Sequence, residues 1–89
     1  PRTARMAMIV SDRHAEITQE IMYGLGRGCT ELKGRGVWSG NDRPVLMCVL
    51  GRTETTRLKA IVADIDAEAI VIVSEVHEAF GEGFSRIGG

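Results

Sequence analysis

Two uninterrupted apolar runs constrain the fold of this chain more than any other feature. Residues 5–11 and 45–50 show little alternation between apolar and polar side chains. Such runs are typical of strands that are buried on both faces. Each run is followed by a segment with helical periodicity, so the sequence predicts two central strands, each leading into a helix.

The first predicted helix carries an apolar stripe at i, i+4 and i+8 spacing, formed by Ile17, Ile21 and Leu25. Ser11 and Asp12 are residue types that cap helix starts, and we expect them to do so here. Gly24 and Gly26 follow the last turns of the stripe, where glycine commonly ends a helix.

The second predicted helix has apolar residues at i, i+3, i+4 and i+7 spacing, namely Leu58, Ile61, Val62 and Ile65. Thr53 is expected to cap its start, with Glu54 in the first turn. The periodic pattern ends at residues 64–66.

Two further strands complete the pattern. Residues 29–37 alternate and predict a half-exposed strand, residues 38–44 have turn composition, and residues 69–73 are rich in β-branched side chains. The order is β-α-β-β-α-β, which predicts a ferredoxin-like α+β fold: a four-stranded antiparallel sheet with two helices on one face. We expect one domain over residues 1–84 and a disordered tail over residues 85–89.

Helices on one face would leave the other face of this sheet uncovered. Both faces of the strands at residues 45–50 and 69–73 are nevertheless apolar. Large exposed apolar patches usually mark an interface. We therefore expect a homo-oligomer, with Val49 and Ile72 in the interface between copies.

Charge and cysteine content limit the partners and the chemistry. The net charge is −1, from 11 basic and 12 acidic residues, and the predicted central strands carry no aromatic side chain for stacking bases. Nucleic acid is therefore not expected as a partner. Cys29 and Cys48 are interpreted as reduced thiols that do not lie opposite each other, because a turn at residues 38–44 would place them at different heights of the hairpin. No closed set of metal ligands or catalytic motif is apparent, so neither a metal, a cofactor nor enzymatic activity is expected.

The glycine-rich hairpin is the candidate binding site. Its ligand-binding candidates are the basic, glycine and aromatic residues Arg27, Gly28, Gly34, Arg35, Gly36 and Trp38. Backbone N–H groups beside arginines can cradle an anion such as a small metabolite or a nucleotide phosphate. The alternative is that the glycines relieve strand bulges and the arginines form a solvated edge that discourages aggregation.

Several short motifs resemble one known family. They are Ile9-Val10-Ser11-Asp12, Arg27-Gly28 with Thr30, Gly34, Gly36, Ser39 and Gly40, Val45-Leu46 with Val49, Leu58, Ile61 and Asp66, and Glu75-Val76 with Gly81-Glu82-Gly83-Phe84. Together they resemble the soluble C-terminal domain of unknown function of YitT-type bacterial membrane proteins. Trp38 departs from the tyrosine that is more usual there.

The resemblance implies a fold similar to the PII and ACT regulatory domains and an attached transmembrane region. With the hairpin, it leads to the hypothesis of a cytoplasmic regulatory or ligand-sensing domain that binds a small anionic metabolite or nucleotide at a subunit interface. The alternative is an oligomerisation module without a ligand. The resemblance identifies no catalytic or binding residues.

Overall fold

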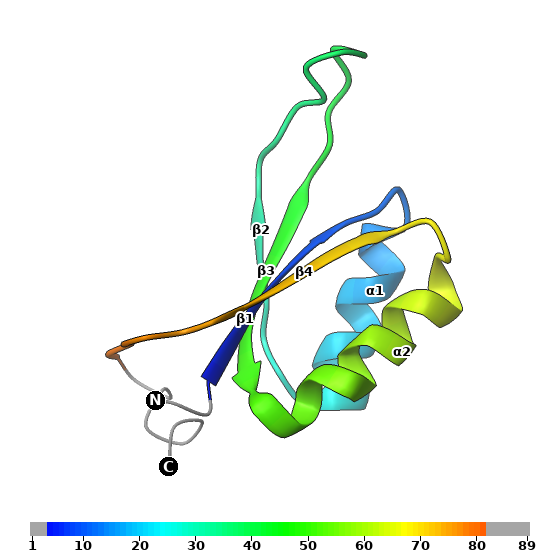
Figure 1. Ribbon diagram of the computed structural model, residues 1–89. Helices are drawn as coiled ribbons and strands as arrows, with labels where there is room; N and C mark the ends of the chain where they lie inside the picture. Colours follow the sequence, from blue (N-terminus) through cyan, green and yellow to red (C-terminus); the bar gives the residue numbers. More distant parts are fainter. Residues whose placement is uncertain (1–3, 82–89) are drawn as a thin grey trace.

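A computed structural model describes residues 4–81 of the chain, and these form an α+β structure (Figure 1). The elements are β1 (Ala4–Val10), α1 (His14–Glu20), the π-helical turn η1 (Ile21–Leu25), β2 (Thr30–Leu32), β3 (Val45–Gly51), the 3-10 turn η2 (Arg52–Glu54), α2 (Thr55–Ile65) and β4 (Ile70–Glu75). The expected β-α-β-β-α-β order is therefore confirmed. The expected tail at residues 85–89 lies outside the described residues.

The four strands form one antiparallel sheet in the order β2-β3-β1-β4. β1 and β3 are the central pair, as their uninterrupted apolar runs predict. Both helices cover the same face of the sheet (Figure 1). This is the ferredoxin-like arrangement expected from the sequence.

The core lies between the helices and the covered face of the sheet. Ile17 and Ile21 from the first helical segment, with Leu58 and Val62 from α2, are fully buried. They pack with the inward side chains of the central strands, Ala7, Ile9, Leu46, Cys48 and Leu50. The two predicted stripes are therefore the faces that the helices bury.

The expected helix caps are wrong. The hydroxyl of Ser11 accepts a hydrogen bond from the Arg13 N–H (2.9 Å) and donates one to Asp66 Oδ2 (2.6 Å). Ser11 thus ties the β1–α1 connection to the end of α2, and α1 begins without a side-chain cap. Thr53 lies inside η2, and the side chain of Glu54 accepts the N–H of Gly51 instead (2.7 Å).

The end of the first helical segment agrees with the sequence at one glycine and departs from it at another. Gly26 caps η1 in the left-handed region, with φ +71°, a conformation that favours glycine. Gly24 lies within the π-helical turn rather than beyond it.

The hairpin between β2 and β3 differs most from the expectation. β2 spans only three residues, and the chain then continues as a hairpin arm, residues 33–44, which projects beyond the sheet (Figure 1). Thr30 pairs with Met47, and one more step of that register brings Cys29 level with Cys48. The expectation that these cysteines are not opposite is therefore wrong, because the turn is centred earlier, near Trp38. Both thiols are free.

Candidate functional site

The hairpin arm is held by its own backbone. Gly36 N–H donates to the Asn41 carbonyl, Gly40 N–H to the Gly36 carbonyl and Arg43 N–H to the Gly34 carbonyl, each at 2.8 Å. A Cβ on Gly34 would lie 2.5 Å from the Arg43 carbonyl oxygen, so this close strand approach requires glycine. These three N–H groups are used inside the arm and are therefore not available to an anion.

Apolar and basic side chains are exposed on the arm. Val37 and Trp38 form its tip and are 90% and 100% exposed. Lys33 and Arg35 are exposed below them, and within residues 4–81 neither side chain makes an ion pair. Arg43 lies 3.5 Å from Asp12. The arm therefore combines an exposed indole with two basic side chains that form no ion pair within residues 4–81, and Asp42 lies directly across the arm from Arg35.

Arg27 is committed to another residue. Its Nε donates to both carboxylate oxygens of Glu54, at 3.1 and 3.0 Å, and its Nη2 lies 3.0 Å from Oε1. This hydrogen-bonded pairing raises the pKa of Arg27. Partial burial opposes ionisation of Glu54, but its hydrogen bonds from Arg27 and the Gly51 N–H outweigh burial and lower its pKa. The pair joins the segment before β2 to the start of α2.

The six predicted ligand residues therefore divide between two places. Gly34, Arg35, Gly36 and Trp38 lie together on the arm, whereas the 27–28 pair lies at the other end of β2. There the Gly28 carbonyl accepts a hydrogen bond from the Cys48 thiol (3.4 Å). Sequence reasoning missed Glu54 as the partner of Arg27, because the two residues are separated by 27 positions and no local pattern links them. The ligand-binding role of the six residues stays a prediction.

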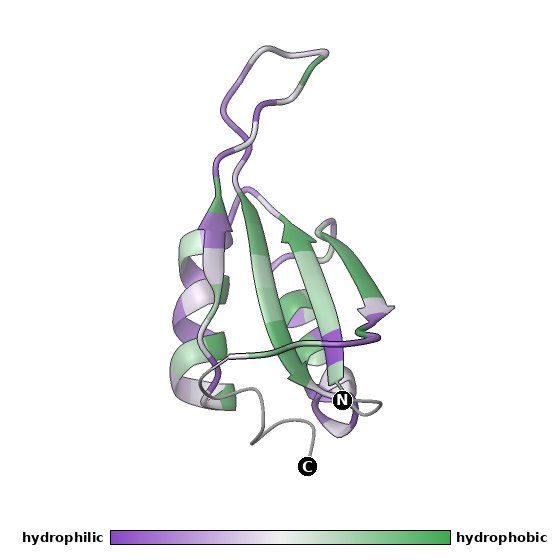
Figure 2. Ribbon diagram, turned by 90° about the vertical axis from the view of Figure 1, so that its left-hand side faces the viewer, coloured by the Kyte–Doolittle hydropathy of each residue, from purple (hydrophilic) through white to green (hydrophobic). Residues whose placement is uncertain are grey.

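The face of the sheet that carries no helix is apolar along its central strands, and in Figure 2 the segment after β4 passes in front of its lower part. The strand register places Leu32, Val45, Val10 and Ile70 in one row across the sheet, and Thr30, Met47, Met8 and Ile72 in the next. Figure 2 shows the hydrophobic colouring along these strands. Ile70 and Ile72 are 51% and 59% exposed. We call this surface the open face, and both predicted interface residues, Val49 and Ile72, lie on it.

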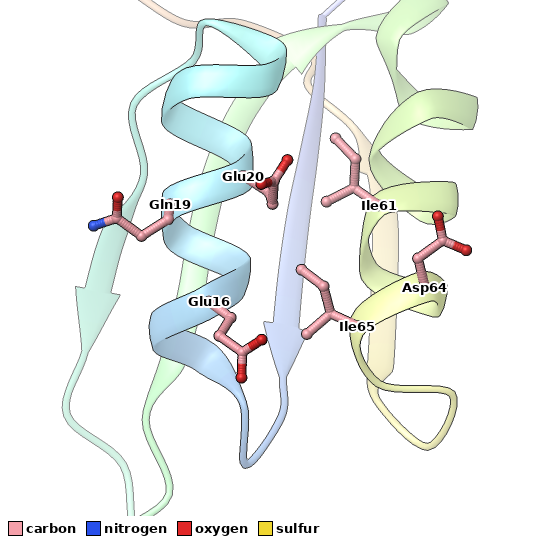
Figure 3. A pocket seen from close by; sticks show the side chains of 6 residues that line it. All are labelled: Glu16, Gln19, Glu20, Ile61, Asp64 and Ile65. Atoms are coloured by element: carbon pink, nitrogen blue, oxygen red, sulfur yellow. The ribbon is translucent and has the colours of Figure 1, made fainter.

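A groove runs between the two helices on the opposite side of the molecule (Figure 3). It has a volume of about 360 Å³. Ile61 and Ile65 of α2 point toward α1, and Glu20 of α1 points toward them (Figure 3). We call this feature the helix groove. Its α2 wall is formed by Ile61, Ile65 and Asp64, and its α1 wall by Glu16, Gln19 and Glu20.

Arg13 bridges two residues that line the helix groove, Glu16 of α1 and Ile65 of α2. It donates hydrogen bonds to both carboxylate oxygens of Glu16, at 2.7 Å each from Nη2, and to the carbonyl of Ile65 (2.8 Å). The charge of Glu16 is therefore compensated. Within the described part of the chain, neither Glu20 nor Asp64 forms an ion pair, and Glu20 is the unpaired carboxylate that points toward the isoleucines (Figure 3).

A smaller hollow of about 250 Å³ lies where the β1–α1 and α2–β4 connections meet. The hydrogen bond from Ser11, assisted by the Glu68 N–H, lowers the pKa of Asp66 there. Arg13, Arg43 and Asp12 complete the polar lining. These groups bind one another, so the hollow is a polar junction between two loops.

Residues 4–81 contain no group of three or more His, Cys, Asp or Glu side chains arranged to hold a metal ion. Over the same range, no helix has the length and hydropathy needed to cross a bilayer.

The fold and these surfaces together define a ferredoxin-like α+β domain with an open apolar face and a projecting hairpin. Residues 27–81, more than half of the chain, match the family described as "Uncharacterized protein conserved in bacteria (DUF2179)". The chain belongs to this family, and the resemblance inferred from the sequence motifs is confirmed.

Curated relatives connect the family to membrane proteins. The chain is 41% identical over 83 residues to "UPF0750 membrane protein YvjA" of Bacillus subtilis (strain 168), covering 93% of this chain and 30% of that protein. It is 39% identical to "Uncharacterized protein in cccA 5'region" of Bacillus sp. (strain PS3), covering 93% of this chain and 55% of that one. The chain thus spans 30–55% of the length of these two relatives.

Solved structures agree with the fold. A DUF2179 protein from Eubacterium ventriosum superimposes with a TM-score of 0.71 at 28% identity, covering 80% of this chain and 97% of that one. A functionally unknown protein from Pediococcus pentosaceus has a TM-score of 0.75 at 13% identity, covering 91% of this chain and 99% of that one. The second likeness concerns the fold alone.

Proposed function

We propose that this domain is a self-associating regulatory module of a membrane protein, in which the open face packs against a second copy. The observation that carries the proposal is the apolar surface of a sheet that has helices on one side only. Packing two such domains would bring together the membrane regions attached to them, in the same or a partner chain. The names of the relatives support this setting, and a cytoplasmic position of the domain is part of the proposal.

The exposed apolar rows of the open face would supply the free energy of association. Fully burying a valine, isoleucine or methionine side chain is worth about 1.5–3 kcal/mol. Ile70 and Ile72 are half exposed, and their neighbours along the rows are partly buried, so a second copy would remove a continuous apolar strip from water. A carboxylate placed within that strip would have to be desolvated without a partner.

Sedimentation velocity of the chain over a range of concentrations tests the proposal. Wild-type protein is expected to form a dimer or larger assembly, and Val49→Glu or Ile72→Glu to shift it toward monomer. Met22→Glu is the matched control, because Met22 is an exposed apolar residue of η1 away from the open face. A wild-type protein that stays monomeric at every concentration would refute self-association.

A second candidate function is the binding of a small anionic metabolite or nucleotide by the arm. The supporting observation is that Arg35 and Trp38 are both exposed on one projecting element, where a charge and a stacking surface are available together. Titration of the protein with ATP, followed through the emission of Trp38, tests it. Saturable quenching that is lost in Arg35→Ala would support the site, and quenching unchanged in that variant would remove Arg35 from it.

A further inference from the structure

We propose that the arm of one copy docks in the helix groove of another, with Trp38 on the isoleucine wall and Arg35 beside Glu20. This inference rests on the proposed self-association and names a second contact for it, distinct from the open face. It also gives the basic arm a protein carboxylate as its anionic partner, in place of a free metabolite.

Geometry requires that the occupant come from another molecule. The arm projects beyond the sheet, away from the two helices that form the groove (Figure 1). Trp38 at its tip is fully exposed, although an indole is a large apolar group that usually finds a contact in assemblies. An element that extends past the body of its own domain meets a neighbouring molecule first.

The two surfaces are complementary in chemistry. The groove offers Ile61 and Ile65, with Asp64, on one wall and the unpaired carboxylate of Glu20 on the other (Figure 3). The arm offers Trp38 beside the exposed guanidinium of Arg35, whose cross-strand neighbour is Asp42. Tryptophan and arginine are both among the residue types enriched at the energetic hot spots of protein interfaces.

The size of the groove also suits this occupant. At about 360 Å³ it falls at the lower end of the range of small-molecule pockets, roughly 300–1,000 Å³. It can take one or two side chains but not a whole helix or strand. The tip of the arm presents two apolar side chains, Val37 and Trp38, on a tight turn.

Trp38 makes the proposal directly measurable, because the chain contains a single tryptophan. In concentrated wild-type protein we expect its emission maximum to lie at shorter wavelength than in dilute protein, where the indole is in water. Trp38→Ala is expected to weaken association by roughly thirtyfold, the scale of an interface anchor. Tyr23→Ala is the matched control, since Tyr23 is an exposed aromatic side chain outside the arm.

Charge reversal tests the pairing of the two elements. Arg35→Glu and Glu20→Arg should each weaken association about fivefold or more and remove the concentration-dependent shift of Trp38 emission. Mixing the two variants should restore both signals, because the altered arm of one copy then meets the altered groove of the other. Glu78→Arg, an exposed carboxylate after β4, is the control reversal. Circular dichroism of each variant confirms that it is folded.

The outcomes separate the two proposals. If Trp38→Ala and the charge reversals associate like the wild type while Ile72→Glu does not, the arm contact is wrong and self-association through the open face stands. If the single variants are weakened but their mixture is not restored, Arg35 and Glu20 are not partners and the docking is overturned. A monomeric wild type refutes self-association and the arm contact with it.

Discussion

Replacing Arg27 by methionine tests whether this predicted ligand residue serves structure instead. In the structure its guanidinium approaches both oxygens of Glu54 within 3.1 Å, and the two side chains are only 30% and 23% exposed. The pair connects the end of η1 to the first turn of α2 across 27 positions of sequence. Methionine keeps the stem that packs there and removes the charge.

The expected loss of unfolding free energy is about 1–2 kcal/mol. Hydrogen bonds to charged groups contribute about 1.5–3 kcal/mol, whereas exposed ion pairs contribute about 0–1 kcal/mol, and this pair is intermediate in exposure. Glu54→Ala should cost more than Arg27→Met, because Glu54 also accepts the N–H of Gly51 (2.7 Å) and that group would lose its partner.

Urea unfolding of the two single variants and the double variant measures the coupling between the side chains. A coupling of about 1 kcal/mol is expected, with Arg52→Met as the control at an exposed arginine next to the pair. Additive single effects would refute the reasoning. If Arg27→Met instead left stability unchanged and abolished anion binding, Arg27 would be the ligand residue that the sequence suggested.

The pH dependence of this pair has a defined sign. The pKa of Glu54 is lower in the folded protein than its ordinary value of 4.5, so the unfolded chain binds the proton more readily. The stabilisation by the pair is therefore complete above pH 4.5 and is lost as the pH falls through the folded pKa. Urea midpoints that fall equally in the wild type and Glu54→Gln over this range would contradict it.

Two further predictions concern the hairpin and the core. Gly34→Ala should speed amide exchange at Gly36 and Arg43 several-fold without affecting β1, because the added Cβ would lie 2.5 Å from the Arg43 carbonyl oxygen. Gly28→Ala is the control, because a Cβ there would meet nothing within 4 Å. Equal exchange rates in the two variants would contradict this prediction. Burial, assisted by Cys29 and Glu54, raises the pKa of the Cys48 thiol from 9.0 to about 11. Unfolding free energy should therefore fall by about 2 kcal/mol between pH 9 and 11 and stay flatter in Cys48→Ala; parallel profiles would refute it.

The fold followed from the sequence because its signals are local and agree with one another. The stripes from Ile17 and from Leu58 have helical spacing, and the runs at residues 45–50 and 69–73 have strand composition. Each pattern depends on burial, and burial against one sheet leaves few arrangements for six elements in this order.

The expectations for the loops were wrong because contacts between distant residues decide the loop structure. Ser11 looks like a helix cap, but its partner Asp66 is 55 positions away, and a pairing of that kind leaves no trace in local composition. The turn is centred near Trp38, within a segment rich in glycine and polar residues in which several positions could form the bend. Alternation of apolar and polar residues does not identify which of them does. Placing the turn too late shifted the expected hairpin register. It separated Cys29 from Cys48, which lie level when the register of Thr30 and Met47 is continued by one residue.

The candidate site was also only partly predictable, because the sequence does not show which backbone N–H groups of the arm are already hydrogen-bonded. The glycines of the arm suggested a backbone cradle for an anion, yet the N–H groups of Gly36, Gly40 and Arg43 are all used within the arm. Gly34 instead lets the two sides of the arm approach each other closely, because a Cβ at this position would clash with the Arg43 carbonyl oxygen. The three N–H groups are thus not available to an anion, and the exposed groups at the tip are the side chains of Val37 and Trp38. The helix groove, with two isoleucines beside a carboxylate, would cover that indole, whereas a bare phosphate without a base to stack on it would leave the indole in water.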